Sequence, residues 1–263
     1  MKFGMPNLVE CKDIYECIET ATLYGLDFIE INMSFPNYKT DALDINKLIE
    51  LKKERNLFFT IHADEQLNPF DFDPKVSSCY LEVMRETIEL AKALDIKVIN
   101  MHLQKGVYVT LPEKVILLTD VYRDEYMAKV RSFIEICERA IGDSGIKIAI
   151  ENVDTNVFTK SQIEAFELFF NSPVFGLTLD VGHDDCMSGK DRHIFEKYPE
   201  RLIHMHLHDS DGKHAHLPLG EGRVNIEEKI SMLPPESTCL VEVKTLRGLK
   251  TSVDYLAARG YIK

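Results

Sequence analysis

The feature that most constrains the fold of this chain is a regular alternation of short strand-like segments with longer helical ones. Residues 80–94 and 130–141 place apolar side chains at helical spacing, which is typical of helices packed on a core. Because parallel strands need long crossover connections, strands that alternate with helices favour a parallel sheet. The eight strand-like segments are KFGMP (2–6), DFIEIN (27–32), LFFTIH (57–62), KVINMH (97–102), KIAIEN (147–152), VFGLTLD (174–180), LIHMHLH (202–208) and CLVEVK (239–244).

Eight is the number of parallel strands that closes into a barrel. We therefore predict an α/β fold, a single (β/α)₈ TIM barrel that forms one domain over residues 1–263, because no linker, low-complexity stretch or charge block divides the chain. An open doubly wound sheet is the alternative. The turn after the first strand lacks the glycine-rich dinucleotide-binding pattern that such a sheet often carries, which favours the barrel.

Composition limits the environment and the partners of the chain. With 45% hydrophobic and 28% charged residues it can bury a large core and stay soluble, and no apolar run has the length of a membrane span. The six cysteines lack metal-ligand spacing and no signal peptide precedes the first strand, so we predict a cytoplasmic protein without a membrane partner. A net charge of −12 disfavours nucleic acid, although bound dications would reverse the sign locally.

Ionisable residues stand at the ends of seven successive predicted strands. In a barrel, alternate strand residues point inward, so these side chains are expected to converge at the mouth formed by the carboxyl ends of the strands. Converging carboxylates repel one another and need counter-charge, and mixed imidazole and carboxylate ligands suit zinc or manganese. A merely polar rim is the alternative. The seven residues are Glu30, His62, His102, Glu151, Asp180, His206 and Glu242.

The loops beyond these strands add further histidines. His183 follows Asp180 by three residues, and the glycine-rich segment 209–222 carries His214 and His216, for which we favour chelation over exposure to solvent. On the seventh strand, His204 and His208 flank the predicted ligand at alternate positions. We interpret His204 as a deeper, hydrogen-bonded barrel residue and His208 as a group that supports a metal ligand.

Two other inward residues stay outside the predicted metal set. Glu30 and Asn100 could contact a substrate hydroxyl, but inward polar side chains are often satisfied by their neighbours. The predicted metal ligands are therefore His62, His102, Glu151, Asp180, His183, His206, His214, His216 and Glu242.

The motifs LDVGH (179–183), MHLHD (205–209) and LPLGEG (217–222) resemble those of the xylose-isomerase-like TIM-barrel superfamily, and the resemblance runs from DFIEIN to VEVKT. This superfamily holds endonuclease IV and the sugar and sugar-phosphate isomerases and epimerases. The resemblance implies a single-metal site in which two glutamates also transfer protons. It further implies that this chain carries counterparts of the additional histidines with which endonuclease IV binds three zinc ions. The single-metal set is Glu151, Asp180, His206 and Glu242, and the further histidines are His62, His102, His183 and His216.

The sequence also departs from both branches of this superfamily. Endonuclease IV has an aspartate where this chain has His214, and the acidic loop after His62 lacks the aromatic wedge that enters DNA. Histidine at position 214 can still bind zinc, so a third metal stays compatible with the sequence, whereas the acidic loop and the net negative charge favour a small substrate over DNA. Conversely, the arginine that the epimerases carry after the seventh strand is not evident, and Lys213 or Arg223 are its candidate substitutes.

The first hypothesis is a metal-dependent isomerase or epimerase of a sugar or sugar phosphate. Bound Zn²⁺ or Mn²⁺ would polarise a carbonyl group. Glu151 and Glu242 would be the catalytic acid and base, and His183 would orient the substrate.

The second hypothesis is a phosphodiesterase similar to endonuclease IV, with up to three metal ions that act on abasic DNA or another phosphate ester. The number of histidines supports it. A non-catalytic metal-binding barrel is the third, but structural zinc sites are closed four-ligand cages, whereas this rim is open. These hypotheses together predict one to three divalent metal ions per chain. The sequence is also compatible with a homo-oligomer.

Overall fold

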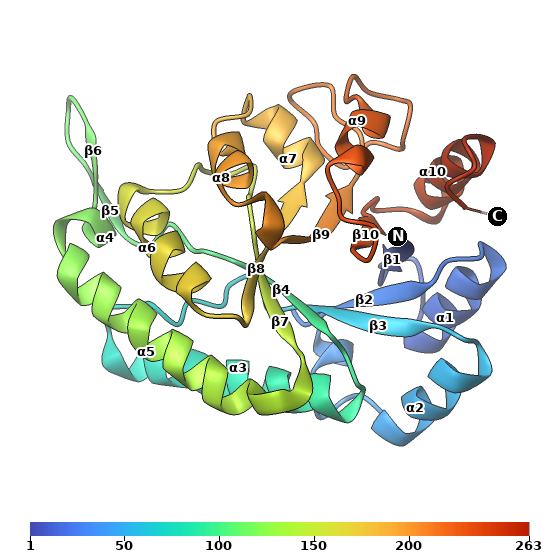
Figure 1. Cartoon of the computed structure of the whole chain (residues 1–263), viewed down its shortest axis with the longest axis horizontal. Helices are drawn as coiled ribbons and strands as arrows, with labels where there is room; N and C mark the ends of the chain where they lie inside the picture. Colours follow the sequence, from blue (N-terminus) through green and yellow to red (C-terminus); the bar gives the residue numbers. More distant parts are fainter. Residues whose placement is uncertain (263) are drawn as a thin grey trace.

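The computed structural model describes residues 1–262 and contains a closed barrel of eight parallel strands, as the sequence predicted (Figure 1). The strands follow the order β1-β10-β9-β8-β7-β4-β3-β2 around the barrel, and β2 pairs with β1 to close it. They are β1 (Lys2–Pro6), β2 (Phe28–Asn32), β3 (Phe58–His62), β4 (Val98–His102), β7 (Lys147–Glu151), β8 (Phe175–Asp180), β9 (Leu202–Leu207) and β10 (Thr238–Val241).

Helices cover the outside of the barrel and bury the outward-facing strand residues (Figure 1). Ile29, Ile61 and Ile150 are completely buried in this layer. The helices are α1 (Ile14–Leu23), α2 (Ile45–Glu54), α3 (Pro74–Ala93), α4 (Leu118–Val121), α5 (Arg123–Ile141), α6 (Lys160–Asn171), α7 (Val181–Cys186), α8 (Arg192–Lys197), α9 (Ile226–Ser231) and α10 (Leu246–Ala258), with 3₁₀ turns η1 (Pro36–Tyr38), η2 (Gly142–Ser144) and η3 (Pro199–Arg201).

Strand register decides which ionisable side chains become neighbours. His102 of β4 lies level with Glu151 of β7, and Asp180 of β8 lies level with His206 of β9. Residues that are level on adjacent parallel strands point to the same side, so these pairs face the interior together. Glu242 is the first residue after β10 and continues the same rim.

The segment after β8 turns sharply into a helix because of its sequence. Asp180 caps α7 by accepting a hydrogen bond from the amide of His183 at 2.7 Å, which anchors the first turn. Only glycine fits at position 182, since a Cβ atom there would lie 2.0 Å from Cε1 of His208. The motif DVGH therefore places His183 directly above the end of β8.

A two-stranded antiparallel hairpin, which the sequence analysis did not predict, interrupts the repeat after β4. It consists of β5 (Tyr108–Thr110) and β6 (Val115–Leu117) and projects from the barrel beside α4 (Figure 1). Among residues 1–262, no helix combines the length and the apolar character needed to cross a membrane.

Candidate metal centre

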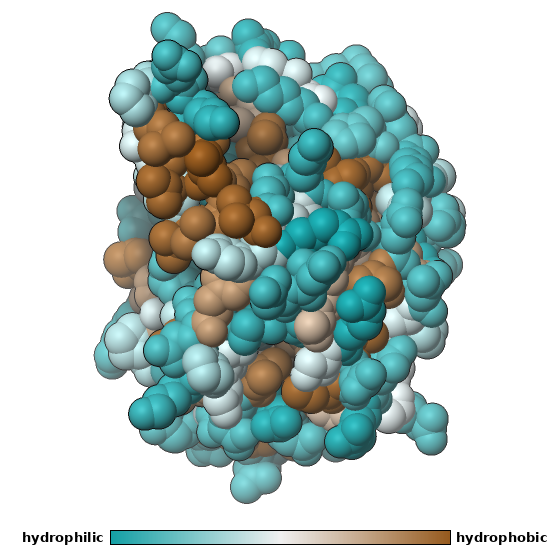
Figure 2. Space-filling view, turned by 90° about the vertical axis from the view of Figure 1, so that its left-hand side faces the viewer, coloured by the Kyte–Doolittle hydropathy of each residue, from teal (hydrophilic) through white to brown (hydrophobic). Residues whose placement is uncertain are grey.

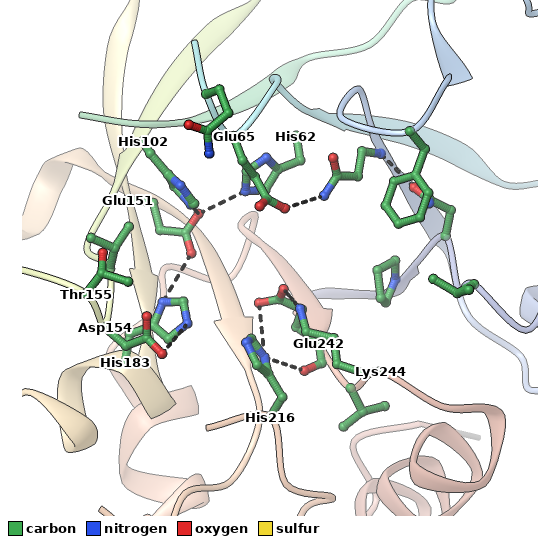
Figure 3. A pocket seen from close by; sticks show the side chains of 18 of the residues that line it. His62, Glu65, His102, Glu151, Asp154, Thr155, His183, His216, Glu242 and Lys244 are labelled. Carbon is green, nitrogen blue, oxygen red and sulfur yellow. Dashed lines mark hydrogen bonds and ion pairs between the residues drawn. The ribbon is translucent and has the colours of Figure 1, made fainter. Parts of the chain in front are cut away.

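A pocket of about 530 Å³ opens at the carboxyl ends of the barrel strands (Figure 3). Most of the predicted ligands line it or lie directly beneath it. Those that line it are His62, His102, Glu151, His183, His216 and Glu242, while Asp180 and His206 are completely buried below.

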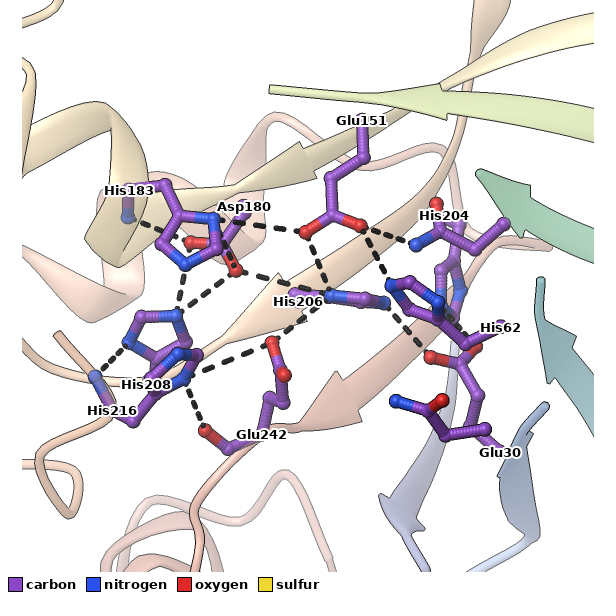
Figure 4. Close-up of polar contacts among 12 residues, drawn as sticks. Glu30, His62, Glu151, Asp180, His183, His204, His206, His208, His216 and Glu242 are labelled. Carbon is purple, nitrogen blue, oxygen red and sulfur yellow. Dashed lines mark hydrogen bonds and ion pairs between the residues drawn. The ribbon is translucent and has the colours of Figure 1, made fainter. Parts of the chain in front are cut away.

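The innermost group consists of three carboxylates around one imidazole nitrogen (Figure 4). Nδ1 of His206 lies 3.1 Å from Oε1 of Glu151, 3.0 Å from Oε2 of Glu242 and 3.8 Å from Oδ2 of Asp180. One ring nitrogen carries at most one proton, which cannot satisfy three carboxylates. Nδ1 of His206 and Oε2 of Glu242 are in fact buried without a hydrogen-bond partner among the described residues. A dication at this point would satisfy all four residues, so the donor set fits a metal ion.

A second group shares Glu151 with the first. Oε2 of this carboxylate lies 3.1 Å from Nε2 of His102 and 3.4 Å from Nε2 of His62, whereas Oε1 faces His206. The two oxygens of Glu151 thus point into two adjacent clusters. This arrangement suits a carboxylate that bridges two cations.

Three histidines form a third group, His183, His208 and His216, but His208 is already hydrogen-bonded through both ring nitrogens. The amide of His216 donates to Nδ1 of His208 at 2.8 Å, so Nε2 of His208 carries the proton and donates to Asp180 at 2.9–3.0 Å. His208 therefore holds a predicted ligand in place, as the sequence interpretation proposed. His183 and His216, whose ring centroids lie 5.2 Å apart, are the members left to bind a cation.

His214 is the one predicted ligand that the structure does not bring into these groups. Its side chain is 73% exposed and its Nδ1 pairs with Oδ2 of Asp211 at 2.9 Å. Hydrogen bonds explain the separation. The amide of His216 donates to Nδ1 of His208 and its Nδ1 donates to the carbonyl of Glu242, which hold His216 at the pocket, whereas His214 pairs only within its own loop.

Backbone carbonyls fix which nitrogen of three histidines faces the pocket. Nδ1 of His62 donates to the carbonyl of Ala63 at 2.7 Å, and Nδ1 of His183 donates to that of Asn152 at 3.2 Å. Nδ1 of His216 likewise donates to the carbonyl of Glu242 at 3.3 Å. Each ring therefore directs Nε2 towards the pocket, and Nε2 is the nitrogen that can bind metal once it carries no proton.

Glu30 lies below the first group and does not reach the pocket. Its Oε1 lies 3.0 Å from Nε2 of His206 and its Oε2 lies 3.2 Å from Nε2 of His204, while Thr60 donates to Oε2 at 2.9 Å. His204 is completely buried and bonded to Thr238, as its deeper strand position predicted. Glu30 thus supports His206 from the side opposite the carboxylates.

We expect Glu30→Gln to weaken metal binding about 10- to 100-fold, the usual effect of removing the partner of a metal-bound histidine. The measurement is competition for Zn²⁺ with a chromophoric chelator. Glu65→Gln is the matched control, because Glu65 lines the pocket but belongs to none of the ligand groups. Equal affinities of the two variants would contradict the supporting role of Glu30.

Burial and charge together set the protonation of the metal-free cluster. Burial opposes every charge here, but His206 and His102 outweigh it and hold the pKa of Glu151 well below its usual value. Similarly, the carboxylates overcome burial and raise the pKa of His206 strongly. Burial also opposes the charge of His62, but Glu151 raises its pKa to about 9. Burial dominates at His216 and lowers its pKa to about 4.

Metal binding is therefore expected to release protons from His62 and His206 at neutral pH. Because these groups hold protons that a cation must displace, the apparent affinity should rise by about tenfold per pH unit for each proton released, from pH 6 towards the pKa of His62. Titration of Zn²⁺ at pH 6, 7, 8 and 9 measures this slope. His62→Asn should reduce the slope, whereas His216→Asn should leave it unchanged because that imidazole is already neutral. A flat profile for the unmodified chain would exclude this protonation pattern.

Two residues beside the ligands were not predicted from the sequence. Asn152 follows Glu151 directly, and its side chain exchanges two hydrogen bonds of 2.9 Å with the backbone of Asp180. Asp154 lies 4.0 Å from Nε2 of His183. Asn152 stands in the motif IEN next to a predicted ligand, which was the available signal. Asp154 lies in the following loop, whose path the sequence did not indicate.

A closed parallel barrel with carboxylates and imidazoles gathered at one mouth defines a (β/α)₈ protein with its functional site at the carboxyl ends of the strands. A family model described as xylose isomerase-like TIM barrel matches residues 18–258, and the chain belongs to this family.

Individual proteins are similar to this chain over most of its length. An uncharacterized protein of Methanocaldococcus jannaschii is 27% identical over 97% of this chain and 88% of its own length. The L-ribulose-5-phosphate 3-epimerase UlaE of Escherichia coli O1:K1 is 22% identical over 94% of this chain and 88% of its own. The crystal structure of a D-tagatose 3-epimerase-like protein superposes with a TM-score of 0.79 at 26% identity, covering 98% and 96% of the two chains. The fold is thus that of sugar epimerases and isomerases.

Proposed function

We propose that this chain is a divalent-metal-dependent isomerase or epimerase of a sugar or sugar phosphate. The observation that carries the proposal is Nδ1 of His206 surrounded by the carboxylates of Glu151, Asp180 and Glu242. These four residues would hold Zn²⁺ or Mn²⁺. When bound, the ion supplies a Lewis acid that polarises a substrate carbonyl. The likeness to epimerases supports sugar chemistry.

Proton transfer would be carried out by the two glutamates of this site. Both are ionised, because burial is outweighed by His206 and the pKa of each lies well below its usual value. Either carboxylate can therefore accept a proton from the carbon next to the carbonyl. Glu151 comes from β7 and Glu242 follows β10. In an epimerisation, one glutamate removes the proton and the other returns it to the opposite face of the enediolate.

Two neighbouring side chains would assist these glutamates. Lys244 lies 2.6 Å from Oε1 of Glu242 and fixes the orientation of that carboxylate. His183 presents Nε2 to the pocket and would orient a substrate hydroxyl, which is the role that the sequence predicted for it.

The charge of the pocket wall favours a sugar without a phosphate group. Among residues 1–262, Lys244 is the single lysine or arginine that lines the pocket, and it is already paired with Glu242. Glu65 and Asp154 add negative charge, which would repel a phosphate dianion. The remaining polar wall consists of one hydroxyl, that of Thr155, and of amides, which donate and accept hydrogen bonds as sugar hydroxyls require: Asn7, Asn32, Gln66, Gln104 and Asn156.

We expect the Zn²⁺- or Mn²⁺-loaded chain to epimerise or isomerise a free ketose and to incorporate solvent deuterium at the reacting carbon. Turnover of the same ketose with a terminal phosphate should have a lower kcat/KM. The measurement is NMR of a panel of ketoses and their phosphates in ²H₂O. A preference for the phosphates would contradict the argument from pocket charge but not the proposed chemistry. The absence of exchange with any sugar would contradict the proposed chemistry.

A phosphodiesterase similar to endonuclease IV is the second candidate, and one observation favours it. Glu151 directs one oxygen to His62 and His102 and the other to His206, so the chain offers adjacent sites for two cations. Paired cations are typical of phosphoryl transfer. The charge of −12 and the scarcity of basic residues in the pocket weigh against DNA as its substrate.

A further inference from the structure

A second pocket lies beside the main one, between the hairpin and the segment that leads into α6. This side pocket is lined by residues 105, 115, 117 and 155–160 and has a volume of about 440 Å³, which is within the usual range of small-molecule sites. It shares Thr155 and Asn156 with the main pocket. The two pockets therefore have a common wall, over which one ligand can extend into both.

The side pocket has an apolar lining. Val115 and Leu117 stand two residues apart on β6, so their side chains share one face of that strand, and both line the pocket. Val157 and Phe158 complete this lining from the facing segment. Figure 2 shows apolar side chains gathered in one area on the side of the molecule that carries the hairpin. Because Val115 is 52% exposed, a ligand group that covers it removes apolar surface from water, which favours binding.

Two lysines give the side pocket a positive charge. Lys105 follows β4 and Lys160 is the first residue of α6, and both line the pocket, whereas no carboxylate of residues 1–262 does so. Nζ of Lys105 lies 4.7 Å from the centroid of the Tyr108 ring, a contact that leaves the charge of the ammonium group in place. In a chain with a net charge of −12, a pocket with two lysines and no acid favours an anionic ligand.

Hydrogen bonds hold the two lysine-bearing segments together. The side chain of Gln162 is completely buried, and its Nε2 donates to the carbonyl of Gln104 at 2.9 Å while its Oε1 accepts from the amide of Thr159 at 2.8 Å. Gln104 directly precedes Lys105, and Thr159 directly precedes Lys160. One buried side chain thus fixes the backbone on both sides of the side pocket before a ligand arrives. Such preorganisation lowers the entropic cost of binding.

We propose that the side pocket is a second substrate-binding site, which takes an apolar group that ends in a carboxylate or a phosphate. This group would be a substituent of the sugar that reacts at the metal centre, so the inference rests on the proposed function for its sugar part. The apolar portion would cover Val115 and Leu117, and the anion would pair with Lys105 and Lys160. The substrate would then be larger than a free pentose or hexose.

The negative wall of the main pocket agrees with this assignment. Glu65 and Asp154 line the main pocket and repel an anion attached directly to the sugar, whereas the described residues place no carboxylate in the wall of the side pocket. The two pockets thus select different parts of one molecule. A neutral sugar would lie at the metal centre, and the anion would lie beyond Thr155 and Asn156.

Binding of small aryl anions to the Zn²⁺-loaded chain tests the side pocket without requiring turnover. Ligand-observed NMR titrations at about 0.15 M salt compare 4-ethylbenzoate and 4-ethylphenyl phosphate with the neutral 4-ethylbenzamide. We expect the better of the two anions, which identifies the anionic group, to bind more tightly than the amide. Lys105→Gln and Lys160→Gln should each weaken its binding about three- to tenfold. Lys114→Gln is the matched control, because it removes a lysine of the same hairpin that does not line the pocket.

A second pair of variants adds a negative charge instead of removing a positive one. Val115→Glu places a carboxylate in the side pocket and should abolish binding of the anions, whereas Val109→Glu changes a comparably exposed valine of β5 outside the pocket and should not. Circular dichroism checks that all variants are folded. Anion binding that resists Lys105→Gln, Lys160→Gln and Val115→Glu would assign the anions to the metal centre and overturn the proposal. Equal binding of the anions and the amide would overturn it as well.

Turnover tests whether the group in the side pocket belongs to the substrate. A ketose with a 4-carboxybenzyl or 4-phosphonooxybenzyl ether at its terminal carbon should have a kcat/KM about three- to tenfold above that of its plain benzyl ether. Lys105→Gln combined with Lys160→Gln should remove this difference, and Lys114→Gln should keep it. Equal values for the charged and neutral ethers in the unmodified chain would overturn the link between the side pocket and the sugar. Absence of turnover with every sugar would instead contradict the proposed function, and the titrations would still decide whether the side pocket binds anions.

Discussion

Glu151→Gln combined with Glu242→Gln is expected to abolish sugar turnover. Each glutamate is proposed both to hold the metal ion and to transfer a proton, and glutamine cannot accept that proton. Loss of one general acid or base typically costs about 10²- to 10⁴-fold in kcat. Because the two residues act as a unit, the double variant should be little slower than the worse single variant.

The structure suggests how to separate chemistry from metal loss in this experiment. Both glutamates lie within 3.1 Å of Nδ1 of His206, so each substitution also weakens the metal site. Turnover, deuterium exchange and metal content should therefore be measured on the same samples at saturating Zn²⁺ or Mn²⁺. Glu65→Gln changes a carboxylate of the same pocket outside the ligand groups and should retain most activity. Retained turnover in the double variant would contradict the proposed mechanism.

Removal of the bound metal is expected to abolish activity and to lower the thermal midpoint. A ligand present at 100 times its dissociation constant stabilises the folded state by about 2.7 kcal/mol. For a chain of this size that corresponds to roughly 5–10 °C in Tm. The physical cause is the repulsion among Glu151, Asp180 and Glu242, which the ion neutralises and protonated His206 neutralises only in part.

Calorimetry before and after chelation, followed by readdition of one metal at a time, measures this effect. Metal analysis of the same protein separates the two candidate functions. About one tightly held ion favours the isomerase, and two or three favour phosphoryl transfer. His62→Ala with His102→Ala is the matched variant, since it removes the outer ligands of Glu151 and leaves the inner group intact. A chain whose Tm and turnover do not respond to chelation would contradict metal dependence.

Much of the fold could be predicted from the sequence because it depends on local patterns. Short apolar strands, and the apolar residues at helical spacing in the segments between them, can be recognised from consecutive residues. Eight such repeats close a barrel. The hairpin β5–β6 was missed because its two strands of three residues each are too short to form a pattern. Its existence depends on the turn at Leu111 and Lys114, not on burial.

The candidate site divides in a similar way. The sequence placed the ligand types at the strand ends, because the inward and outward alternation of a strand is a local property. Tertiary structure alone decided that the two oxygens of Glu151 face different clusters, that Glu30 supports His206 from below, that His214 stays outside, and that Asp180 is the ligand which His208 supports. These outcomes depend on the register between strands and on hydrogen bonds that join the loop residue His216 to His208 and Glu242. Such features arise from contacts between residues far apart in the chain, which no local pattern encodes.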